Sequence, residues 1–418
     1  MRAALFAVSR DRSGPAPALI GTEPVAFLIA DAYGMGGTIR TTFNMAAWLA
    51  RRHPVEIVSA IRARDTTFFP LPDGVRLTQL DDRRKGHQPD GLKGWVRAVL
   101  SAMPSPFADP ADGAYPTWTL WTDLMVVLWL RSVRDGVLIT TRPRFNVLAG
   151  RGVDRRVVVI GQEHLHAAAY PPNVRAVIER EYPHLDVLTV LTEQDKADYE
   201  GILSGGRVRV TRIPNGAQRA GRNLALEERG TTIVAAGRLT KVKGFDLLIE
   251  AWSRVEASWP DWTVDVYGRG PEREALQALI TERGLNGRVR LMGPTPDLRA
   301  RLEAAGMFVL PSRLEGFPLV LIEAMAAACP VISFDCPRGP GEIVHDRVNG
   351  MLVAPEDVTG LAAAIQESLA SPELRRTLSL AAAATSRCYS VEAVGARWDA
   401  LLGPSTEDLH LSSRGGID

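Results

Sequence analysis

The feature that most constrains the fold of this 418-residue chain is a repeated alternation of short apolar runs with stretches of helical periodicity. Residues 25–33 form an apolar run, 34–52 combine a Gly-rich turn with an amphipathic helix, and 55–60 form a second apolar run. Two strands joined by a helix lie parallel in one sheet, because the helical crossover returns the chain to the edge where it started. Further strands of this first sheet are expected at 137–140, 156–160, 187–191 and 208–216.

The same alternation starts again after residues 217–230, a stretch without apolar periodicity that we interpret as a linker. Strands are expected at 231–237, 262–268, 289–293, 307–312, 330–335 and 350–353, with helices between them. A chain of 418 residues exceeds what one hydrophobic core usually supports. We therefore predict an α/β protein of two doubly wound, Rossmann-like domains that face each other across a cleft.

The domain boundaries are predicted from the same pattern. An N-terminal domain is expected at 1–218 and a C-terminal domain at 219–385. A final helix at 386–403 is expected to pack back on the first domain, ahead of a flexible tail at 404–418. Residues 61–120 are rich in Pro, Gly and Asp and fit neither periodicity, so we expect long loops there.

Composition excludes several classes of protein. A hydrophobic content of 46% and a charged content of 23% are typical of a soluble globular protein, and a net charge of +1 argues against a nucleic-acid partner. The few cysteines lack Cys-x-x-Cys spacing, which disfavours a disulfide framework or zinc site and favours the cytoplasm. The apolar run at 124–130 is too short to cross a bilayer, and the N-terminus is a poor match to a signal peptide.

Two Gly-rich turns follow predicted strands, at 34–36 and 268–270. A dinucleotide fingerprint requires a third glycine three residues further on, where this chain has Ile39 and Arg273. A nicotinamide-dependent oxidoreductase is therefore disfavoured, and no Walker lysine motif is present. Each turn is compatible both with a tight bend and with a backbone that approaches a ligand.

Three cations lie between a predicted strand and the helix that follows it: Arg238, Lys241 and Lys243. Backbone amides and the dipole at a helix N-terminus favour an anion, and an Arg side chain adds two parallel donors for phosphate oxygens. A solvated surface is the alternative for any pair of cations. Their clustering at the carboxyl end of a strand favours phosphate.

Two carboxylates, Glu315 and Glu323, lie at the carboxyl end of a later strand of the same predicted sheet. Carboxylates repel phosphate but accept two hydrogen bonds from vicinal hydroxyls. The amides of Gly316 and Phe317, ahead of the next helix, add donors for a leaving phosphate. Cations for a diphosphate and carboxylates for sugar hydroxyls together indicate a nucleotide-sugar site.

The segments "GRLTKVKGFDLLIEA", "YGRGPE", "LPSRLEGFP" and "NGMLV" follow one another in this order, and Glu315 and Glu323 have Glu-x7-Glu spacing. In these motifs the chain resembles the retaining glycosyltransferases of family 4, which have the glycosyltransferase B fold. The resemblance covers about residues 230–355 and is weaker over the first domain. It implies an acceptor-binding N-terminal domain and a C-terminal domain that binds the nucleotide-sugar donor.

The resemblance also implies residue roles. Arg238 and Lys243 would hold the donor diphosphate. Glu323 would bind the ribose hydroxyls, and Glu315 would contact the transferred sugar.

In the first domain, Gly36 and Gly37 match the family's Gly-Gly turn near the donor phosphates and the acceptor. The segment "GQEHLHAAAY" resembles the one that carries the family's active-site histidine, for which we choose His164 ahead of His166. For either histidine, a satisfied polar residue at a strand end is an equally good interpretation.

The segment "FDCPRGPGEIV" resembles a subgroup active in bacterial exopolysaccharide and surface-glycan synthesis, which favours UDP-sugars over GDP-sugars. The expected reaction moves a hexose-type sugar, with retention, to a glycan, lipid-linked or polymer acceptor. The departing diphosphate oxygen would help to deprotonate the acceptor hydroxyl on the same face. No Asp-x-Asp occurs in the chain, and no metal or other cofactor is expected, because protein cations take the place of Mg²⁺.

The basic, aromatic segment 83–97, with tryptophans further on at 118, 121 and 129, suggests peripheral contact with an anionic membrane and hence a place at its inner face. A solvated loop and a buried helix at 118–131 are the favoured alternative. Rival functions are a nucleotide-sugar epimerase or phosphorylase on the same fold, and a non-catalytic sugar-nucleotide-binding protein.

Overall fold

The structure is a computed structural model that describes residues 19, 21–87, 91–107, 117–218 and 228–403. The chain divides into two compact units, unit 1 (residues 1–213 with 395–418) and unit 2 (residues 214–394). The predicted tail at 404–418 and most of the predicted linker lie outside the described residues.

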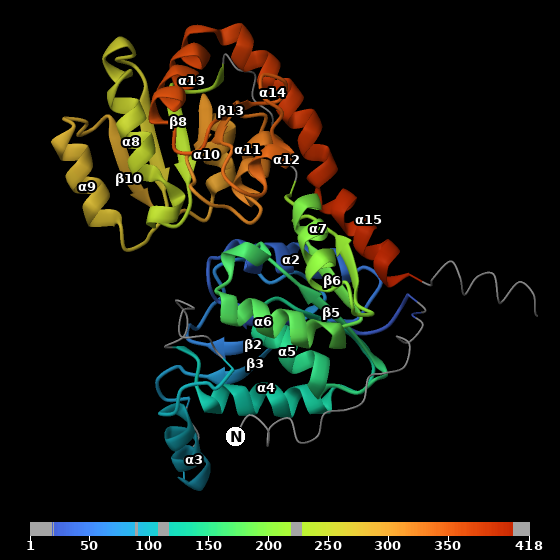
Figure 1. The fold of residues 1–418 in the computed structure, drawn as a ribbon. Helices are drawn as coiled ribbons and strands as arrows, with labels where there is room; N and C mark the ends of the chain where they lie inside the picture. The colour runs from blue at the N-terminus through green and yellow to red at the C-terminus, as the bar shows by residue number, and fades with distance from the viewer. Residues whose placement is uncertain (1–18, 20, 88–90, 108–116, 219–227, 404–418) are drawn as a thin grey trace, which may run out of the picture. The chain divides into compact units, whose positions relative to one another are not determined.

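Unit 1 (Figure 1) contains a parallel sheet. Its strand order is β3-β2-β1-β4-β5-β6-β7. Its strands are β1 (Val25–Asp31), β2 (Val55–Arg62), β3 (Val75–Asp82), β4 (Gly136–Thr140), β5 (Val157–Gln162), β6 (Val187–Val190) and β7 (Arg209–Arg212). The chain adds strands on one side of β1 as far as β3 and then returns to add β4 on the other side. The pair β1 and β4 is therefore the topological switch point, where parallel sheets of this type bind ligands at the carboxyl ends of their strands.

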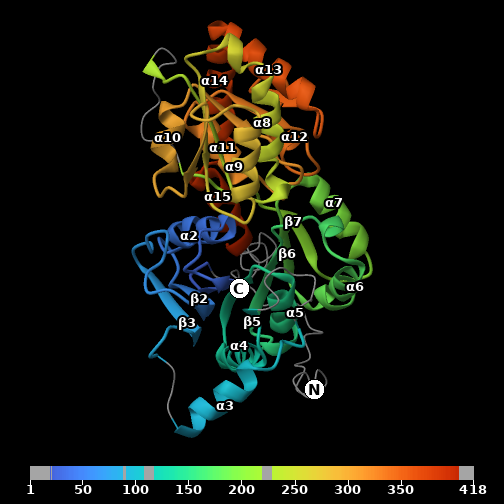
Figure 2. The same ribbon diagram turned by 90° about the vertical axis from the view of Figure 1, so that its left-hand side faces the viewer.

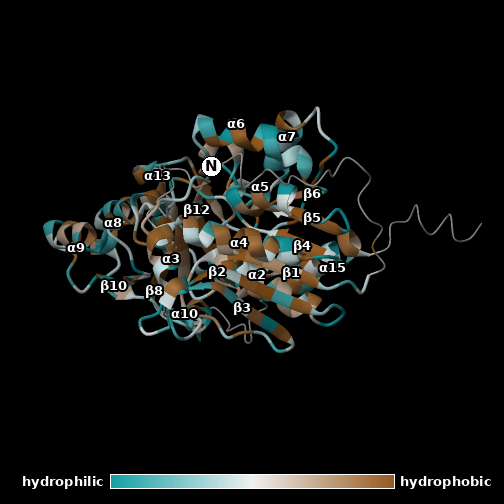
Figure 3. Ribbon diagram, turned by 90° about the horizontal axis from the view of Figure 1, so that it is seen from below, coloured by the Kyte–Doolittle hydropathy of each residue, from teal (hydrophilic) through white to brown (hydrophobic). Residues whose placement is uncertain are grey.

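Helices cover both faces of this sheet. They are α2 (Gly37–Leu49), α4 (Leu120–Ser132), α5 (Pro143–Gly152), α6 (Pro172–Glu181) and α7 (Glu193–Ile202), whereas α3 (Gly91–Ser101) packs on α4. The hydrophobic core on one face joins α4 and α5 to the sheet, through residues such as Leu130, Phe145 and Leu188. In Figure 3, β5 is largely hydrophobic and α7 largely hydrophilic, as expected for a central strand and a surface helix.

The last helix, α15 (Val391–Leu402), crosses the division between the units, which falls between Val394 and Gly395 rather than at 385/386. Its second half packs on α2 of unit 1. The indole Nε1 of Trp48 donates to Asp399 Oδ2 at 3.2 Å. A side chain at Gly395 would lie 2.4 Å from the Trp48 ring, so the two helices approach each other closely.

Unit 2 contains a second parallel sheet, in the order β10-β9-β8-β11-β12-β13. Its strands are β8 (Thr232–Ala236), β9 (Thr263–Tyr267), β10 (Val289–Gly293), β11 (Met307–Leu310), β12 (Val331–Phe334) and β13 (Met351–Val353). All six lie where the sequence predicts strands. The order reverses between β8 and β11, which form the switch point of this sheet.

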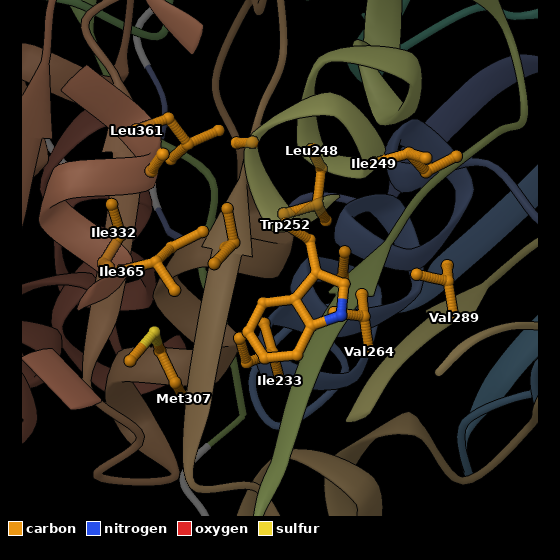
Figure 4. Packing of buried hydrophobic residues seen from close by; sticks show 14 of the residues in the cluster. Ile233, Leu248, Ile249, Trp252, Val264, Val289, Met307, Ile332, Leu361 and Ile365 are labelled. Carbon is orange, nitrogen blue, oxygen red and sulfur yellow. The ribbon is translucent and has the colours of Figure 1, made fainter. Parts of the chain in front are cut away.

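Helices also cover both faces of the second sheet: α8 (Phe245–Ser253), α9 (Arg273–Glu282), α10 (Leu298–Ala304), α11 (Leu319–Ala326), α12 (Pro340–Ile343), α13 (Val358–Ala370) and α14 (Pro372–Ser386). Helix α8 packs against α9 and α13, and α11 packs against α10 and α14 (Figure 1, Figure 2). The core centres on Trp252, which is fully buried among residues such as Leu248, Ile233 and Val264 (Figure 4).

The prediction of long loops at 61–120 is wrong in part. Strand β3 is a polar edge strand in which Val75 and Asp81 are buried, so its sequence lacks a continuous apolar run. Helix α3 was missed as well; of its residues only Arg97 is buried, and Leu92 and Trp95 are exposed. Among the described helices, α5, α6, α12 and α14 were not predicted either.

Candidate functional site

Most of the donor-binding residues predicted from the sequence lie in two loops of unit 2. One loop follows β8 and holds Arg238 and Lys243, and the other follows β11 and holds Glu315. Because β8 and β11 are neighbours at the switch point, the sheet brings residues more than 70 positions apart to one place on its carboxyl edge.

An ion pair joins the two loops. Lys243 Nζ lies 2.6 Å from Glu315 Oε1, and the same oxygen accepts a hydrogen bond of 2.7 Å from Ser312 Oγ. The Glu315 side chain is 7% exposed and that of Lys243 is 27% exposed. A carboxylate so deeply buried needs both donors, because an unpaired buried charge is strongly unfavourable. Ser312 was not predicted, since it lies on the buried side of the loop.

Close backbone packing fixes the loop after β8, residues 237–244, which we call the lysine loop. The loop turns through a short 3-10 helix, η5 (Lys241–Lys243), into Gly244, which has φ +63° and starts α8. A Cβ atom at Gly244 would lie 1.9 Å from the Pro311 carbonyl oxygen, so only glycine allows the two loops to meet here. The anchored backbone aims Lys243 at Glu315.

The second Gly-rich turn serves the same loop. A Cβ atom at Gly268, which has φ +146°, would lie 1.8 Å from the carbonyl oxygen of Gly237. Leu239 N donates to Arg269 O at 3.0 Å. Close backbone packing therefore accounts for the glycine at 268, and its effect is to support the segment that carries Arg238.

Arg238 itself is exposed at the end of β8. Within the described residues, its guanidinium makes no hydrogen bond or ion pair, and only its carbonyl is engaged, by Thr240 N at 2.8 Å. The side chain is thus available for an anionic ligand beside Lys243.

The segment after Glu315 leads into α11. Phe317 is 7% exposed and packs on Tyr389, with ring centroids 5.7 Å apart. Among the described residues, the amides of Gly316 and Phe317, ahead of the helix N-terminus, donate no hydrogen bond. Glu323 is half-buried in the middle of α11.

A strained loop lies against this segment. Arg338 has φ +69° and Gly339 φ +107°, and a Cβ atom at Gly339 would lie 2.8 Å from Pro318 Cδ. Burial, with the nearby charge of Glu315, raises the pKa of the Cys336 thiol to about 12, so this cysteine is an uncharged part of the loop. Left-handed backbone at a non-glycine residue is costly and concentrates at functional sites.

In unit 1, Gly36 and Gly37 lie where β1 leads into α2. Gly36 is the N-cap of the helix and has φ −73°, which any residue can adopt. A Cβ atom at Gly36 would come no closer than 4.0 Å to another residue, and one at Gly37 would have nothing within 4 Å. These glycines are needed neither for backbone conformation nor for packing, and they leave the helix N-terminus open.

His164 follows β5. Burial, with a contribution from the charge of Arg142, lowers its pKa to about 3, so the imidazole is neutral. Its Nε2 is shielded from solvent and has no hydrogen-bond partner in the described part of the chain. His166 is 6% exposed and caps the short helix η2 (Ala167–Ala169). The Nε2 atom of His164 is thus a buried polar atom without a hydrogen-bond partner among the described residues.

The residue before this histidine was not predicted, and it is the centre of a buried polar network. Glu163 accepts hydrogen bonds from Tyr170 at 2.6 Å, from Asn146 at 3.1 Å and from Tyr182. Burial raises the pKa of Glu163 to about 7 despite these three donors. The network ties the start of the loop that carries His164 to α5 and to the segments at Tyr170 and Tyr182.

Within the described residues, no cluster of three or more His, Cys, Asp or Glu side chains has the geometry to hold a metal ion. In the same part of the chain, no helix has the length and hydropathy of a membrane span.

Residues 218–385 match the family model described as "Glycosyl transferases group 1". This stretch contains Arg238, Lys243, Glu315 and Glu323. The motifs that carry the resemblance to glycosyltransferases thus fall in the part of the chain that the family model recognises.

Curated relatives include an exopolysaccharide phosphotransferase of Streptomyces coelicolor, 31% identical over 90% of this chain and 40% of the relative. An uncharacterised glycosyltransferase of Haemophilus influenzae is 29% identical over 52% of this chain and 61% of the relative. The amylovoran biosynthesis glycosyltransferase AmsD of Erwinia amylovora is 27% identical over 64% of this chain and 77% of the relative. The chain thus spans less than two thirds of the length of the first two of these relatives.

Solved structures with the same fold include S. aureus TarM in complex with UDP and alpha-GlcNAc-glycerol (TM-score 0.72, 15% identity, covering 91% of this chain and 100% of that one). Sucrose-phosphate synthase from Thermosynechococcus elongatus has a TM-score of 0.71 at 19% identity and covers 93% and 100%. Anabaena HepE in complex with UDP-glucose has a TM-score of 0.67 at 16% identity and covers 91% and 99%. The likeness confirms the predicted glycosyltransferase B fold, with two parallel-sheet α/β domains.

Proposed function

We propose that this protein is a retaining, metal-independent glycosyltransferase of family 4. It moves a hexose-type sugar from a nucleoside diphosphate donor, UDP in preference to GDP, to a saccharide, lipid-linked or polymer acceptor in bacterial surface polysaccharide synthesis. One observation carries the proposal: the ion pair of Lys243 and Glu315 at the switch point of unit 2, inside the segment that matches group 1 glycosyl transferases.

Unit 2 binds the donor in this proposal. The exposed Arg238 and the Lys243 ammonium bind the diphosphate, and the amides of Gly316 and Phe317 add neutral donors. Glu315 faces the sugar hydroxyls, and Glu323 faces the ribose. UDP is favoured by the sequence of the 334–344 loop and by the UDP complexes of TarM and HepE.

Unit 1 supplies the acceptor side. Its open turn at Gly36 and Gly37 leaves the amides of α2 accessible to a ligand oxygen. The neutral imidazole of His164, with its unsatisfied Nε2, binds a hydroxyl of the sugar or acceptor. Sparse cysteines without a framework are in keeping with a cytoplasmic site of action.

In the proposed reaction, the bond between the anomeric carbon and the diphosphate breaks as the acceptor oxygen bonds to the same face. The departing oxygen takes the acceptor proton, and UDP leaves. Arg238 and Lys243 stabilise the charge that grows on this oxygen, which is the role that a divalent cation plays in metal-dependent enzymes.

A second candidate is transfer of a sugar phosphate, which is favoured by the S. coelicolor relative named as a phosphotransferase. This chain covers 40% of that protein, so the named activity can reside outside the shared part. Glycosyl transfer from a UDP-sugar releases UDP, whereas transfer of a sugar phosphate releases UMP.

The test is a panel of UDP- and GDP-sugars, screened for binding by ligand-observed NMR and then incubated for slow turnover. Release of UDP together with the free, unmodified sugar supports the proposal. Release of UMP supports phosphotransfer, and conversion to an isomeric sugar without any acceptor supports an epimerase. Release of sugar 1-phosphate from a glycan and inorganic phosphate identifies a phosphorylase, and binding without turnover of any donor, even with added glycan acceptors, identifies a non-catalytic binding protein.

For the predicted membrane contact, the structure changes the residues involved. Arg83 and Arg97 bind Asp81, and Arg84 binds Asp82, so most of the predicted basic patch is neutralised within the protein. Trp118 is 2% exposed and belongs to the core.

The candidate for membrane contact is instead helix α3. Two of its large apolar side chains, Leu92 (77%) and Trp95 (65%), are exposed, and Lys93 is exposed beside them. We propose that this face rests on anionic lipid. Flotation with vesicles of anionic lipid at low salt is expected for the wild type and lost in Leu92→Ser/Trp95→Ser, and absence of flotation in the wild type would contradict the contact.

A further inference from the structure

Arg313, two residues before Glu315, makes more contacts than its surface position requires. Its Nη1 donates to Lys241 O at 2.7 Å and to Asp246 Oδ1 at 2.8 Å, and its Nη2 donates to Asp246 Oδ2 at 2.7 Å. Its Nε donates to Glu356 Oε2 at 2.7 Å. All three of its guanidinium nitrogens are thus engaged, in the bidentate geometry that is the strongest for an Arg–carboxylate pair.

These contacts join loops that follow three different strands. Lys241 lies in the lysine loop after β8, and Asp246 lies in the first turn of α8, which follows that loop. Arg313 lies in the loop after β11 that also holds Glu315, and Glu356 follows β13. One side chain therefore ties together three loops at the carboxyl edge of a single sheet. Glu356 has φ +58°, a conformation unfavourable for a non-glycine residue, so the bond to Arg313 helps to hold a strained turn.

The lysine loop is clamped on both sides of Lys243. On one side, the Arg313 guanidinium holds Lys241 O, and the Arg313 amide donates to Val242 O at 2.8 Å. On the other side, the same guanidinium holds Asp246 in the first turn of α8. The backbone that carries Lys243 is thus fixed to the backbone that carries Glu315.

Burial and charge indicate that the clamp is stable. The Arg313 side chain is 19% exposed and that of Asp246 is 37% exposed. Burial opposes ionisation of Asp246, but the hydrogen bonds and charge of Arg313 prevail and lower its pKa. The pair is therefore charged throughout the neutral range.

We propose that Arg313 is a positioning residue, which does not touch the donor but sets the distance between Lys243 and Glu315 that donor binding and transfer require. The identity of the donor rests on the proposed function; the positioning itself does not. Since a displacement of about 1 Å can cost about a hundredfold in rate, loss of Arg313 is expected to lower kcat/KM for the donor by about ten- to a hundredfold. The acceptor KM is expected to stay unchanged.

The experiment compares Arg313→Ala and Asp246→Asn with a matched control, Arg347→Ala. Arg347 forms a bidentate pair with Glu367 at 2.7 and 2.8 Å in the same unit, between a loop and α13. The control removes an ion pair of the same kind without touching the lysine loop. If Arg313→Ala does not fold, Asp246→Asn still tests the positioning role, because it weakens the same ion pair.

Two readouts are taken: donor kinetics and hydrogen exchange at the amides of Lys243 and Gly244, which donate to Thr240 O at 2.9 Å and Lys241 O at 3.1 Å. Both test variants are expected to exchange these amides faster and to lose donor kcat/KM, with partial rescue of Arg313→Ala by added guanidinium. The control is expected to change neither. Unchanged exchange, or donor kinetics equal to those of the control, would overturn the positioning role. A wild type that turns over no nucleotide sugar would instead refute the proposed function, while the exchange measurement still decides the positioning.

Discussion

Replacement of Lys243 by alanine is the most informative single change in unit 2. It removes the ammonium that lies 2.6 Å from Glu315 and leaves the buried carboxylate with Ser312 as its one remaining partner among those described. We expect a large loss of turnover together with a moderate loss of stability, and the two effects have different origins.

The size of the stability loss follows from the burial of the pair. Removing one partner of a fully buried ion pair costs about 3–5 kcal/mol. Lys243 is 27% exposed and Ser312 keeps its hydrogen bond, so we expect about 2 kcal/mol here. For a unit of this size, that corresponds to a fall of about 4–8 °C in melting temperature.

The loss of turnover comes from the leaving group. Removing one donor that stabilises the developing charge typically lowers kcat by about a hundred- to a thousandfold. The assay is UDP release from the donor found in the panel, alongside thermal unfolding. In Lys243→Ala/Glu315→Gln the buried charge is gone, so most of the stability is expected to return while turnover stays low. Undiminished turnover in Lys243→Ala would refute the assignment, and a double variant no more stable than the single one would refute the magnitude.

Three further predictions follow from individual contacts. The pKa of Glu163 is raised from 4.5 to about 7, so between these pH values the folded protein binds a proton that the unfolded chain has lost, and stability falls as pH rises; urea unfolding should show this slope in the wild type and not in Glu163→Gln. Gly244→Ala places a methyl group 1.9 Å from Pro311 O at a residue with a left-handed conformation, so this variant should lose more than about 1 kcal/mol of stability. It should also bind UDP more weakly in calorimetry. Gly37→Ala, whose methyl group meets nothing within 4 Å, should keep its stability. Treatment with EDTA should leave UDP release unchanged, and a loss restored by Mg²⁺ would count against metal-independent transfer.

Much of the fold could be predicted because buried parallel strands are continuous apolar runs and because each is followed by an amphipathic helix. Helix α3 broke this rule, since it buries Arg97 and exposes Leu92 and Trp95. Strand β3 broke it as well, because as an edge strand it alternates Arg76 and Thr78 with apolar residues.

The sequence predicted which residue types form the candidate site, but not the residues that hold them in position. Lys243 and Glu315 stand out as a cation and a carboxylate after strands, and the strand order then explains why they meet. Arg313 gives no such signal, because its partner Asp246 is 67 positions away and the sequence does not reveal the contact. Glu163 was not predicted, because its hydrogen-bond donors Tyr170, Tyr182 and Asn146 come from separate parts of the sequence.

The most direct test of the central claim is ligand-observed NMR of the wild type with UDP, UDP-sugars and GDP-sugars, with Glu323→Ala in parallel. The account predicts saturation transfer to the uracil and ribose protons of UDP and of at least one UDP-sugar, and weaker transfer to the ribose in the variant. Absence of transfer to every nucleotide in the panel would contradict it.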